Sequence, residues 1–493
     1  MPFSRTRTVL AALVLAPRSH LVKTQPGGRL VLLSKKPPMR RLWWLVAGGM
    51  AIACAAGFGL GRLTRFPNRA QIEDDVFLDL AQTLASNSQA GGDYSAAILM
   101  LAQVDDPRLP QYLVDLLSQT SQPETLAAIQ QALVSQGLDS LPPLLALSRI
   151  LDNELQQTLA TDVRQVLLDQ RHVVQQAIAK LLTVHSDELA GTRLDRVNLG
   201  QYRDADRAFR LIQPGLVAAG TSWQGANLSY ANLTGAKFFD VGPDGKADSY
   251  DDIISDFSES ALVAVSLEQA NLQGVQLANA NLRRADLRDA NLTYGNLEQT
   301  HLTNARLMHV NAAHSRWWGS NLVGADLTQA LLQGADFSQA RLNRVSASHS
   351  DWSKATLSQS DWVEANLIGA NFSQADLTRA NLQGANLDSA DFTRADLRKA
   401  NLRDADLSQA TLTGANLTDA DLAGAIFHDG RGASDSFITP KAQLSAANRM
   451  RGVNFSRVRN LDSRQLNYIC AQGAVHPACQ DIPNRAEQGF QAQ

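Results

Sequence analysis

The chain lacks the short motifs that mark common enzymes. Its 493 residues contain no glycine-rich phosphate loop, no serine, histidine and aspartate arrangement of a hydrolase, and no metal motif of useful specificity. Charge is also weak, because 45 basic and 48 acidic residues leave a net charge of only −3. The sequence therefore gives no support for catalysis, and we expect neither an enzyme nor a bound cofactor.

Long apolar runs are scarce, but one of them is long enough to cross a bilayer. Leu42–Gly61 carries no charge, and its length is close to the roughly 20 residues that a spanning helix needs. Trp43 and Trp44 lie at its start, as interface anchors do. The sequence predicts a single transmembrane helix over 42–61.

The charges that flank this segment predict its orientation. Residues 1–41 carry nine Lys or Arg and no acid, whereas the other flank mixes both signs. Because the basic side stays in the cytoplasm, we expect a cytoplasmic N-terminus, with 1–41 as a basic arm on anionic lipid. The bulk of the chain would then lie in a periplasmic or thylakoid-luminal space.

Two alternatives for this segment stay open. Met39–Arg41 followed by an apolar run resembles a true translation start with a cleavable signal, in which case residues 1–38 are not part of the structure. Lipid attachment at Cys54 is the other alternative, but the large aliphatic residue expected three positions earlier is absent. We interpret Cys54 as an ordinary small membrane residue.

Residues 68–190 are rich in Leu, Ala and Gln and are interrupted by Gly and Pro, which predicts a helical domain. Short amphipathic helices are expected at 109–117, 124–134 and 141–151. Their spacing resembles that of HEAT-like paired helices, and a plain helical bundle is an equal alternative. One long helix is expected over 153–185.

A five-residue pattern then runs without a break from 262 to 427. Counting every fifth residue from Leu262 gives 34 centres, of which 32 are Leu, Phe or Trp, and only Ala312 and Ala347 are smaller. The residue two before each centre is always small. A period of five fits neither a helix nor a flat strand, so the pattern predicts a wound solenoid.

Segments such as Ala-Asn-Leu-Ser-Tyr at 226–230 and Ala-Asp-Leu-Thr-Arg at 375–379 resemble the pentapeptide-repeat family. The resemblance implies a right-handed, four-sided β-helix with one pentapeptide on each side of a coil, in which the centre and the small residue point inward. Aromatic centres that are four repeats apart agree with this geometry; they are Trp352, Phe372 and Phe392 in one column and Trp317 and Phe337 in another.

We place the β-helix at 192–427, with an inserted loop at 241–260, because the interval from Phe238 to Leu262 is not a multiple of five and the pattern restarts. The loop is acidic and offers weak calcium-ligand candidates, namely Asp240, Asp244, Asp248, Asp251 and Asp252. The glutamate that ends an EF-hand loop is missing. A solvated acidic loop is therefore the favoured interpretation.

One place on the β-helix is irregular enough to suggest recognition. Trp317 should fill the core, whereas Trp318 should point outward close to Arg316. Exposed Trp beside Arg is typical of an interface hot spot. The alternative is that Trp318 packs over a side loop or over the 241–260 segment.

Residues 428–493 are expected to form a cap and tail, with Val453, Phe455, Leu461 and Leu466 covering the last coil. Cys470 and Cys479 are close in sequence in this cap, and the inferred oxidising compartment favours a disulfide between them. His476 raises a zinc alternative, but the spacing matches no standard zinc pattern.

These features together predict a non-catalytic, single-span protein-interaction scaffold whose partner and oligomeric state the sequence does not name. The bilayer would be contacted through one helix, and no nucleic acid is expected. The alternative function is that of soluble family members that mimic DNA and bind gyrase. Against it, residues 262–427 carry 17 acidic and 13 basic side chains, a weak imitation of a duplex with one charge per about 1.7 Å. The family is abundant in cyanobacteria, which makes a plasma or thylakoid membrane the expected site.

Overall fold

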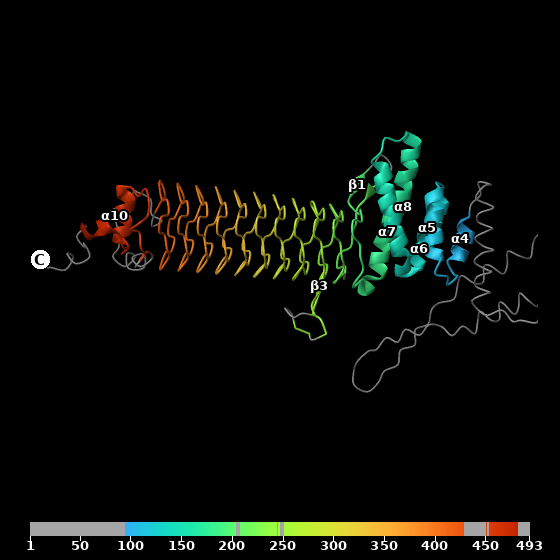
Figure 1. Cartoon of the computed structure of the whole chain (residues 1–493), viewed down its shortest axis with the longest axis horizontal. Helices are drawn as coiled ribbons and strands as arrows, with labels where there is room; N and C mark the ends of the chain where they lie inside the picture. The colour runs from blue at the N-terminus through green and yellow to red at the C-terminus, as the bar shows by residue number, and fades with distance from the viewer. Residues whose placement is uncertain are drawn as a thin grey trace, which may run out of the picture. The chain divides into compact units, whose positions relative to one another are not determined.

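A computed structural model describes residues 94–203, 208–243, 245–246, 251–427, 450 and 453–481. A helical domain leads into a long ladder of single β-bridges (Figure 1). The helices are α4 (Ser95–Leu101), α5 (Leu109–Gln119), α6 (Pro123–Ser135), α7 (Leu141–Leu155) and α8 (Thr161–Val184), with short 3-10 turns η1 (Gly137–Ser140) and η2 (Ser186–Glu188). The helices predicted at 109–117, 124–134 and 141–151 are confirmed as parts of α5, α6 and α7.

Proline positions explain where these helices begin. α5, α6 and α7 each carry Pro within their first two positions, where the missing N–H costs no helical hydrogen bond. The helices then pack in two layers, one of α4, α6 and α8 and the other of α5 and α7. The region is therefore all-helical, and its assignment to the HEAT class stays a prediction.

The single long helix predicted over 153–185 is wrong. α7 ends at Leu155, and α8 begins at Thr161 after Ala160, whose backbone is extended. The reason is burial, because α7 and α8 each carry an apolar side, and a turn between them lets the two helices pack against one another.

The ladder confirms the coil of four pentapeptides. From Asp256 to Ile426, each outward residue before a centre forms a parallel bridge with the residue four repeats on, as in the series Asn281, His301 and Asn321. One such bridge occurs on each of the four sides of a coil. The inward centres are buried throughout, and Ala312 and Ala347 are each followed one side later by a fully buried tryptophan, Trp317 or Trp352.

The corners between the sides are tight turns. The N–H of Ala270 donates to the carbonyl of Leu267 at 3.0 Å, and the third turn residue, Gln269, has a φ of 59°. This positive φ is that of a type II turn, and it recurs at almost every corner. The conformation costs a non-glycine residue roughly 1–2 kcal/mol, which explains why Gly occupies many corners, Gly324 among them.

Two hairpins interrupt the first coils. The first consists of β1 (Tyr202–Arg203) and β2 (Ala208–Phe209), and the second of β3 (Phe239–Asp240) and β4 (Ile253–Ile254). In a regular coil Ser222 would pair with Gly242, but across the second hairpin it pairs with Asp256 instead. The insertion leaves the ladder intact because it lies at a corner.

The predicted loop boundary of 241–260 is therefore wrong at its C-terminal end. Phe257 is a buried centre, and Asp256 before it already bridges to Gln276 in the next coil. Ser255, Asp256 and Phe257 repeat the small, acidic and apolar order of the motif, so the regular pattern resumes one repeat earlier than expected.

A helix donates hydrogen bonds to each end of the ladder. At the start, Gln175 of α8 donates from Nε2 to the main-chain oxygen of Asn198 in the first coil at 2.7 Å. At the end, α10 (Ser463–Ala471) places Gln465 so that its Nε2 donates to the carbonyls of Leu422 and Ala425, at 2.9 and 2.8 Å.

The cap also continues the ladder. Asn454 bridges to Asn416 on one side and Val475 on the other. Val453 and Phe455 are buried, and Leu461 and Leu466 are partly buried. The predicted cap is thus present in 453–481, and its first residues form one more rung of the β-helix. A final 3-10 turn, η3, spans Pro477–Asp481.

Several sequence predictions fall outside the described residues. They are the basic arm at 1–41, the start at Met39, the membrane helix at 42–61, the role of Cys54, and the first part of the predicted helical domain, residues 68–93. Within the described ranges, no helix combines the length and apolar character that a membrane crossing requires.

Candidate protein-interaction surface

Most outward positions of the β-helix are polar, so its exposed aromatic side chains stand out. Trp318 is 38% exposed and Tyr294 is 46% exposed. They lie in neighbouring coils, together with His314, Arg316 and Glu298. We call these five residues the aromatic patch.

Tyr294 and His314 form one edge of the patch. They occupy equivalent corners of successive coils, and their rings stack with centroids 5.4 Å apart and planes 15° apart. The next corner is Gly334, where a Cβ would lie 2.8 Å from Nδ1 of His314. The absent side chain at Gly334 therefore gives the imidazole its space.

Arg316 and Trp318 lie on the side that follows this edge. Trp317 between them is fully buried, so its neighbours face outward. Arg316 pairs with Glu298 of the preceding coil at 3.4 Å, with both side chains largely exposed. Such a surface ion pair contributes little stability and leaves the guanidinium and the indole accessible on one side of the β-helix.

The sequence singled out Arg316 and Trp318 but missed Tyr294 and His314. A usable signal existed, because the two rings are four repeats apart, the same interval that stacks Trp317 on Phe337 with centroids 4.9 Å apart. Side chains at equivalent corners of successive coils lie above one another, as the side chains of equivalent centres do. The patch is therefore wider than the predicted pair.

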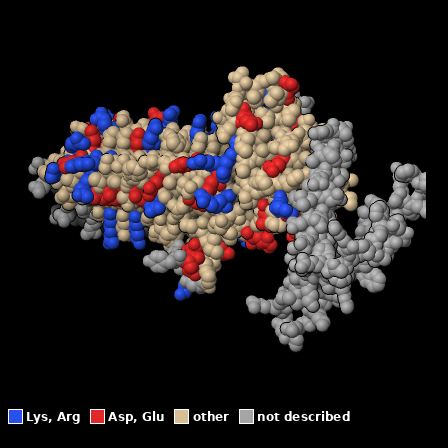
Figure 2. All heavy atoms as spheres, turned by 45° about the vertical axis from the view of Figure 1, so that its right-hand side comes forward, with Lys and Arg blue, Asp and Glu red and all other residues tan. Residues whose placement is uncertain are grey.

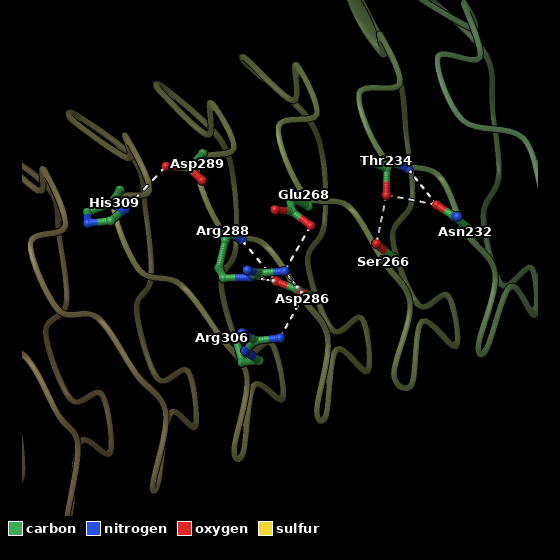
Figure 3. Close-up of polar contacts among 9 residues, drawn as sticks. All are labelled: Asn232, Thr234, Ser266, Glu268, Asp286, Arg288, Asp289, Arg306 and His309. Atoms are coloured by element: carbon green, nitrogen blue, oxygen red, sulfur yellow. Dashed lines mark hydrogen bonds and ion pairs between the residues drawn. The ribbon is translucent and has the colours of Figure 1, made fainter.

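A charge network lies in neighbouring coils on the side of the β-helix opposite to Arg316 and Trp318. Residues two repeats apart, such as Arg306 and Arg316, lie on opposite sides of a four-sided coil. Arg288 contacts Glu268 and Asp286 at 2.8 Å, and Arg306 contacts Asp286 at 3.0 Å (Figure 3). Burial raises the pKa of the Asp286 carboxyl, but hydrogen bonds from Arg288 and the charge of Arg306 outweigh it and hold that pKa below its usual value. This network is neutralised internally and presents no reactive group.

The recurring Asn and Asp residues are structural. Asn232 accepts at Oδ1 from the N–H of Thr234 at 3.1 Å and from its hydroxyl at 2.8 Å, and Thr234 also contacts Ser266 of the next coil at 2.9 Å (Figure 3). The same bond to the N–H two positions on recurs along the ladder, for example from Thr378 to Asp376 at 2.9 Å. Carboxylates used in this way are not catalytic pairs.

Within its described residues, the hairpin of β3 and β4 contains no cluster of metal-ligating side chains. Asp240, Asp251 and Asp252 lie in the described part, whereas Asp244 and Asp248 lie outside it. Across the described ranges, His, Cys, Asp and Glu nowhere gather in a group of three or more that could hold a metal ion.

The cap contains the cysteine pair. Cys470 and Cys479 are joined by a disulfide, with Cα atoms 5.2 Å apart. His476 lies between them, and its Nδ1 accepts from the N–H of Ala478 at 3.1 Å. Because the two sulfurs are bonded to each other, neither is available as a thiolate ligand for zinc.

Comparison with known proteins agrees with this geometry. The profile described as "Pentapeptide repeats (8 copies)" matches residues 217–241, 255–289, 270–308, 285–316, 320–359, 363–394 and 390–429. The crystal structure of HetL, a pentapeptide repeat protein involved in heterocyst differentiation regulation from the cyanobacterium Nostoc sp. strain PCC 7120, is 32% identical. That match covers 50% of this chain and 96% of HetL, with a TM-score of 0.29.

Two further solved structures are similar. A pentapeptide repeat protein of the Arabidopsis thaliana thylakoid lumen is 29% identical over 28% of this chain and 85% of its own, with a TM-score of 0.15. QnrB1, a plasmid-mediated fluoroquinolone resistance protein, is 17% identical over 48% and 92%, with a TM-score of 0.22. No curated protein matches. The chain belongs to the pentapeptide-repeat family.

Proposed function

We propose that the chain is a non-catalytic scaffold that binds a partner protein through the aromatic patch. The observation that carries the proposal is the exposure of Trp318 and Tyr294, 38% and 46%, on a surface whose other outward positions are mostly polar. Trp, Tyr and Arg are the residue types that dominate binding energy at protein interfaces. The rigid ladder would hold them at a fixed place.

We further propose that Leu42–Gly61 anchors the scaffold in a membrane, with the bulk of the chain in a periplasmic or luminal space. The uncharged stretch and its basic N-terminal flank support this topology. The disulfide between Cys470 and Cys479 also supports it, because disulfides persist in oxidising compartments.

Imitation of DNA has less support. Basic and acidic side chains lie side by side along the visible face of the β-helix (Figure 2), and some neutralise each other, as Arg288 does with Glu268 at 2.8 Å. A mimic of a duplex needs an unbroken row of negative charge.

The binding proposal is tested by placing a photo-cross-linking amino acid at position 318 of the full chain in its native host. A matched control carries it at position 331, where Leu331 is 44% exposed on another side of the β-helix. We expect a cross-linked protein from position 318 only. Trp318→Ala and Tyr294→Ala should each weaken its binding about tenfold or more, and Leu331→Ala should not.

Unchanged recovery of that protein by both aromatic variants would refute the role of the patch. The topology is tested separately with a C-terminal tag and protease added to intact spheroplasts or sealed vesicles. Digestion of the tag supports an extracytoplasmic scaffold, whereas protection places the chain in the cytoplasm and returns gyrase-like targets to consideration.

A further inference from the structure

A second surface lies where the helical domain meets the first coil, apart from the aromatic patch. A cavity of about 630 Å³ has one wall made by the helical domain, with Leu138, Leu141, Pro142, Leu145 and Ala146, and another made by Thr192, Arg193 and Asp195. A second hollow of about 340 Å³ shares Arg149, Arg193 and Asp195 and continues past Arg196 to Glu259. The combined cleft is apolar at one end and charged at the other.

The coil wall of this cleft is the open edge of the β-helix. In a regular rung, Asn281 donates its N–H to the carbonyl of Ser260 at 2.9 Å and accepts from the N–H of Leu262 at 2.8 Å, both in the preceding coil. Arg193 holds the equivalent position in the first rung, where it bridges to Ser222. It has no preceding coil, and among the described residues nothing bonds to its main-chain N–H or carbonyl.

The helical domain covers the same edge at two positions that follow Arg193. Arg149 of α7 donates to the main-chain oxygen of Asp195 at 2.9 Å, and Gln175 of α8 donates to that of Asn198 at 2.7 Å. The edge is therefore capped next to the cleft and open within it. An unpaired strand edge is a template for pairing with another chain.

We propose that an extended segment of a partner protein, with an apolar, acidic and apolar order of side chains, binds in this cleft as an additional rung. Its main chain makes the two hydrogen bonds to Arg193 that Ser260 and Leu262 make to Asn281. Side chains on either side of the bridge then face inward, as Ser260 and Leu262 do, toward the apolar wall of the helical domain. Strand addition of this kind takes its affinity from the main chain and its specificity from alternate side chains.

The acidic residue of the segment follows from the charges at the cleft. Asp195 is already committed, because it pairs with Arg193 at 2.9 Å and accepts from the Ser222 hydroxyl at 2.5 Å. Arg149 and Arg196 line the same hollow without a carboxylate partner among the described ion pairs. Glu259 also lines this hollow, so three Arg side chains are matched by only two carboxylates. The middle side chain of the segment faces outward beside Arg193, and a carboxylate there completes the charge balance.

The test uses the full chain and a fluorescent octapeptide in which Val alternates with Glu, followed by fluorescence anisotropy at low salt. We expect it to bind at least tenfold more tightly than the same peptide with Lys in place of Glu. Two further peptides are N-methylated at every second amide, one at the Val amides and the other at the Glu amides. One of them should lose binding and the other should keep it, because a strand uses only alternate amides.

Protein variants locate the site. Ala146→Arg fills the cleft from an exposed position and should remove binding. Arg196→Glu should weaken binding at least tenfold, whereas Arg284→Glu, at a corner with the same backbone (φ 58° against 57°), should not. Equal binding of both methylated peptides, no preference for Glu over Lys, no binding of the Glu peptide, or equal effects of the two Arg variants would each overturn the proposal.

Discussion

Every tryptophan that fills a centre in the described coils donates its indole N–H to a hydroxyl two positions earlier. Trp352 donates to Ser350 at 2.6 Å, and the Ser350 hydroxyl itself donates to the carbonyl of Ala347 at 2.5 Å. The same arrangement joins Trp223 to Thr221, Trp317 to Ser315 and Trp362 to Ser360. We predict that Ser350→Ala destabilises the coil around Trp352.

The magnitude follows from burial. Trp352 is fully buried, so its N–H would have no water to replace the lost acceptor. Leaving a buried donor unpaired costs about 1–3 kcal/mol. Ser320 is the matched control, because it occupies the same position before Leu322, is equally buried, and its hydroxyl has no hydrogen-bond partner. Ser320→Ala should therefore be neutral or slightly stabilising.

Hydrogen exchange measured by mass spectrometry suits this comparison, because coils of a repeat protein open locally and a global midpoint would average over them. Amides in 341–361 should exchange roughly 5- to 150-fold faster in Ser350→Ala. Amides in 311–331 should be unchanged or slower in Ser320→Ala. If the two substitutions have equal effects, the indole bond does not contribute as argued.

Three further predictions concern the corners and the charge network. Ala264 has a φ of 52°, so Ala264→Gly should stabilise by about 0.5–1 kcal/mol, whereas Ala261→Gly, on the neighbouring strand position, should destabilise in denaturant titrations. Gly334→Ala should lower the melting temperature more than Gly235→Ala, because only the first meets a neighbour, 2.8 Å from its added Cβ. The pKa of the Asp286 carboxyl is lowered in the folded state, so the carboxylate stabilises the fold fully above its ordinary pKa of 3.8 and loses this effect as the pH falls through its folded pKa. Asp286→Asn should therefore be less stable than the unchanged chain at pH 7. The difference between the two should disappear when unfolding is measured in acid.

The repeat itself could be predicted because each of its residues acts locally and periodically. Centres such as Leu262, the small residue two positions before each centre, and the stacking of Trp352 on Phe372 all follow from a coil of four pentapeptides. The hydroxyl beneath each tryptophan was not predicted, although the sequence shows it. The motif treats Ser350 and Ser315 as small residues like Ala, and size alone conceals the need of an indole N–H for an acceptor.

The insertions were harder to place, for a physical reason. The side chain of a corner residue is outside the core, so the chain can leave the ladder there and return with little constraint on length. Because extra residues separate Ser222 from its partner Asp256, a count of repeats that starts at Leu262 misses the point where the chain returns to the ladder. The sequence likewise predicts Val453–Phe455 as part of a cap, although its small, Asn and Phe order is that of another repeat.

The regularity of the ladder also decides where binding can arise. An outward Asn or Asp that is bonded within its own repeat, as Asn232 is with Thr234, is already used by the fold. Recognition is then expected at departures from the motif, and the two proposed binding surfaces, the aromatic patch around Trp318 and the open edge at Arg193, are both of this kind. They differ in kind, because the first offers side chains and the second offers the main chain. A single partner that used both would have to span several coils, so variants at Trp318 and Arg196 should act independently unless one protein bridges them.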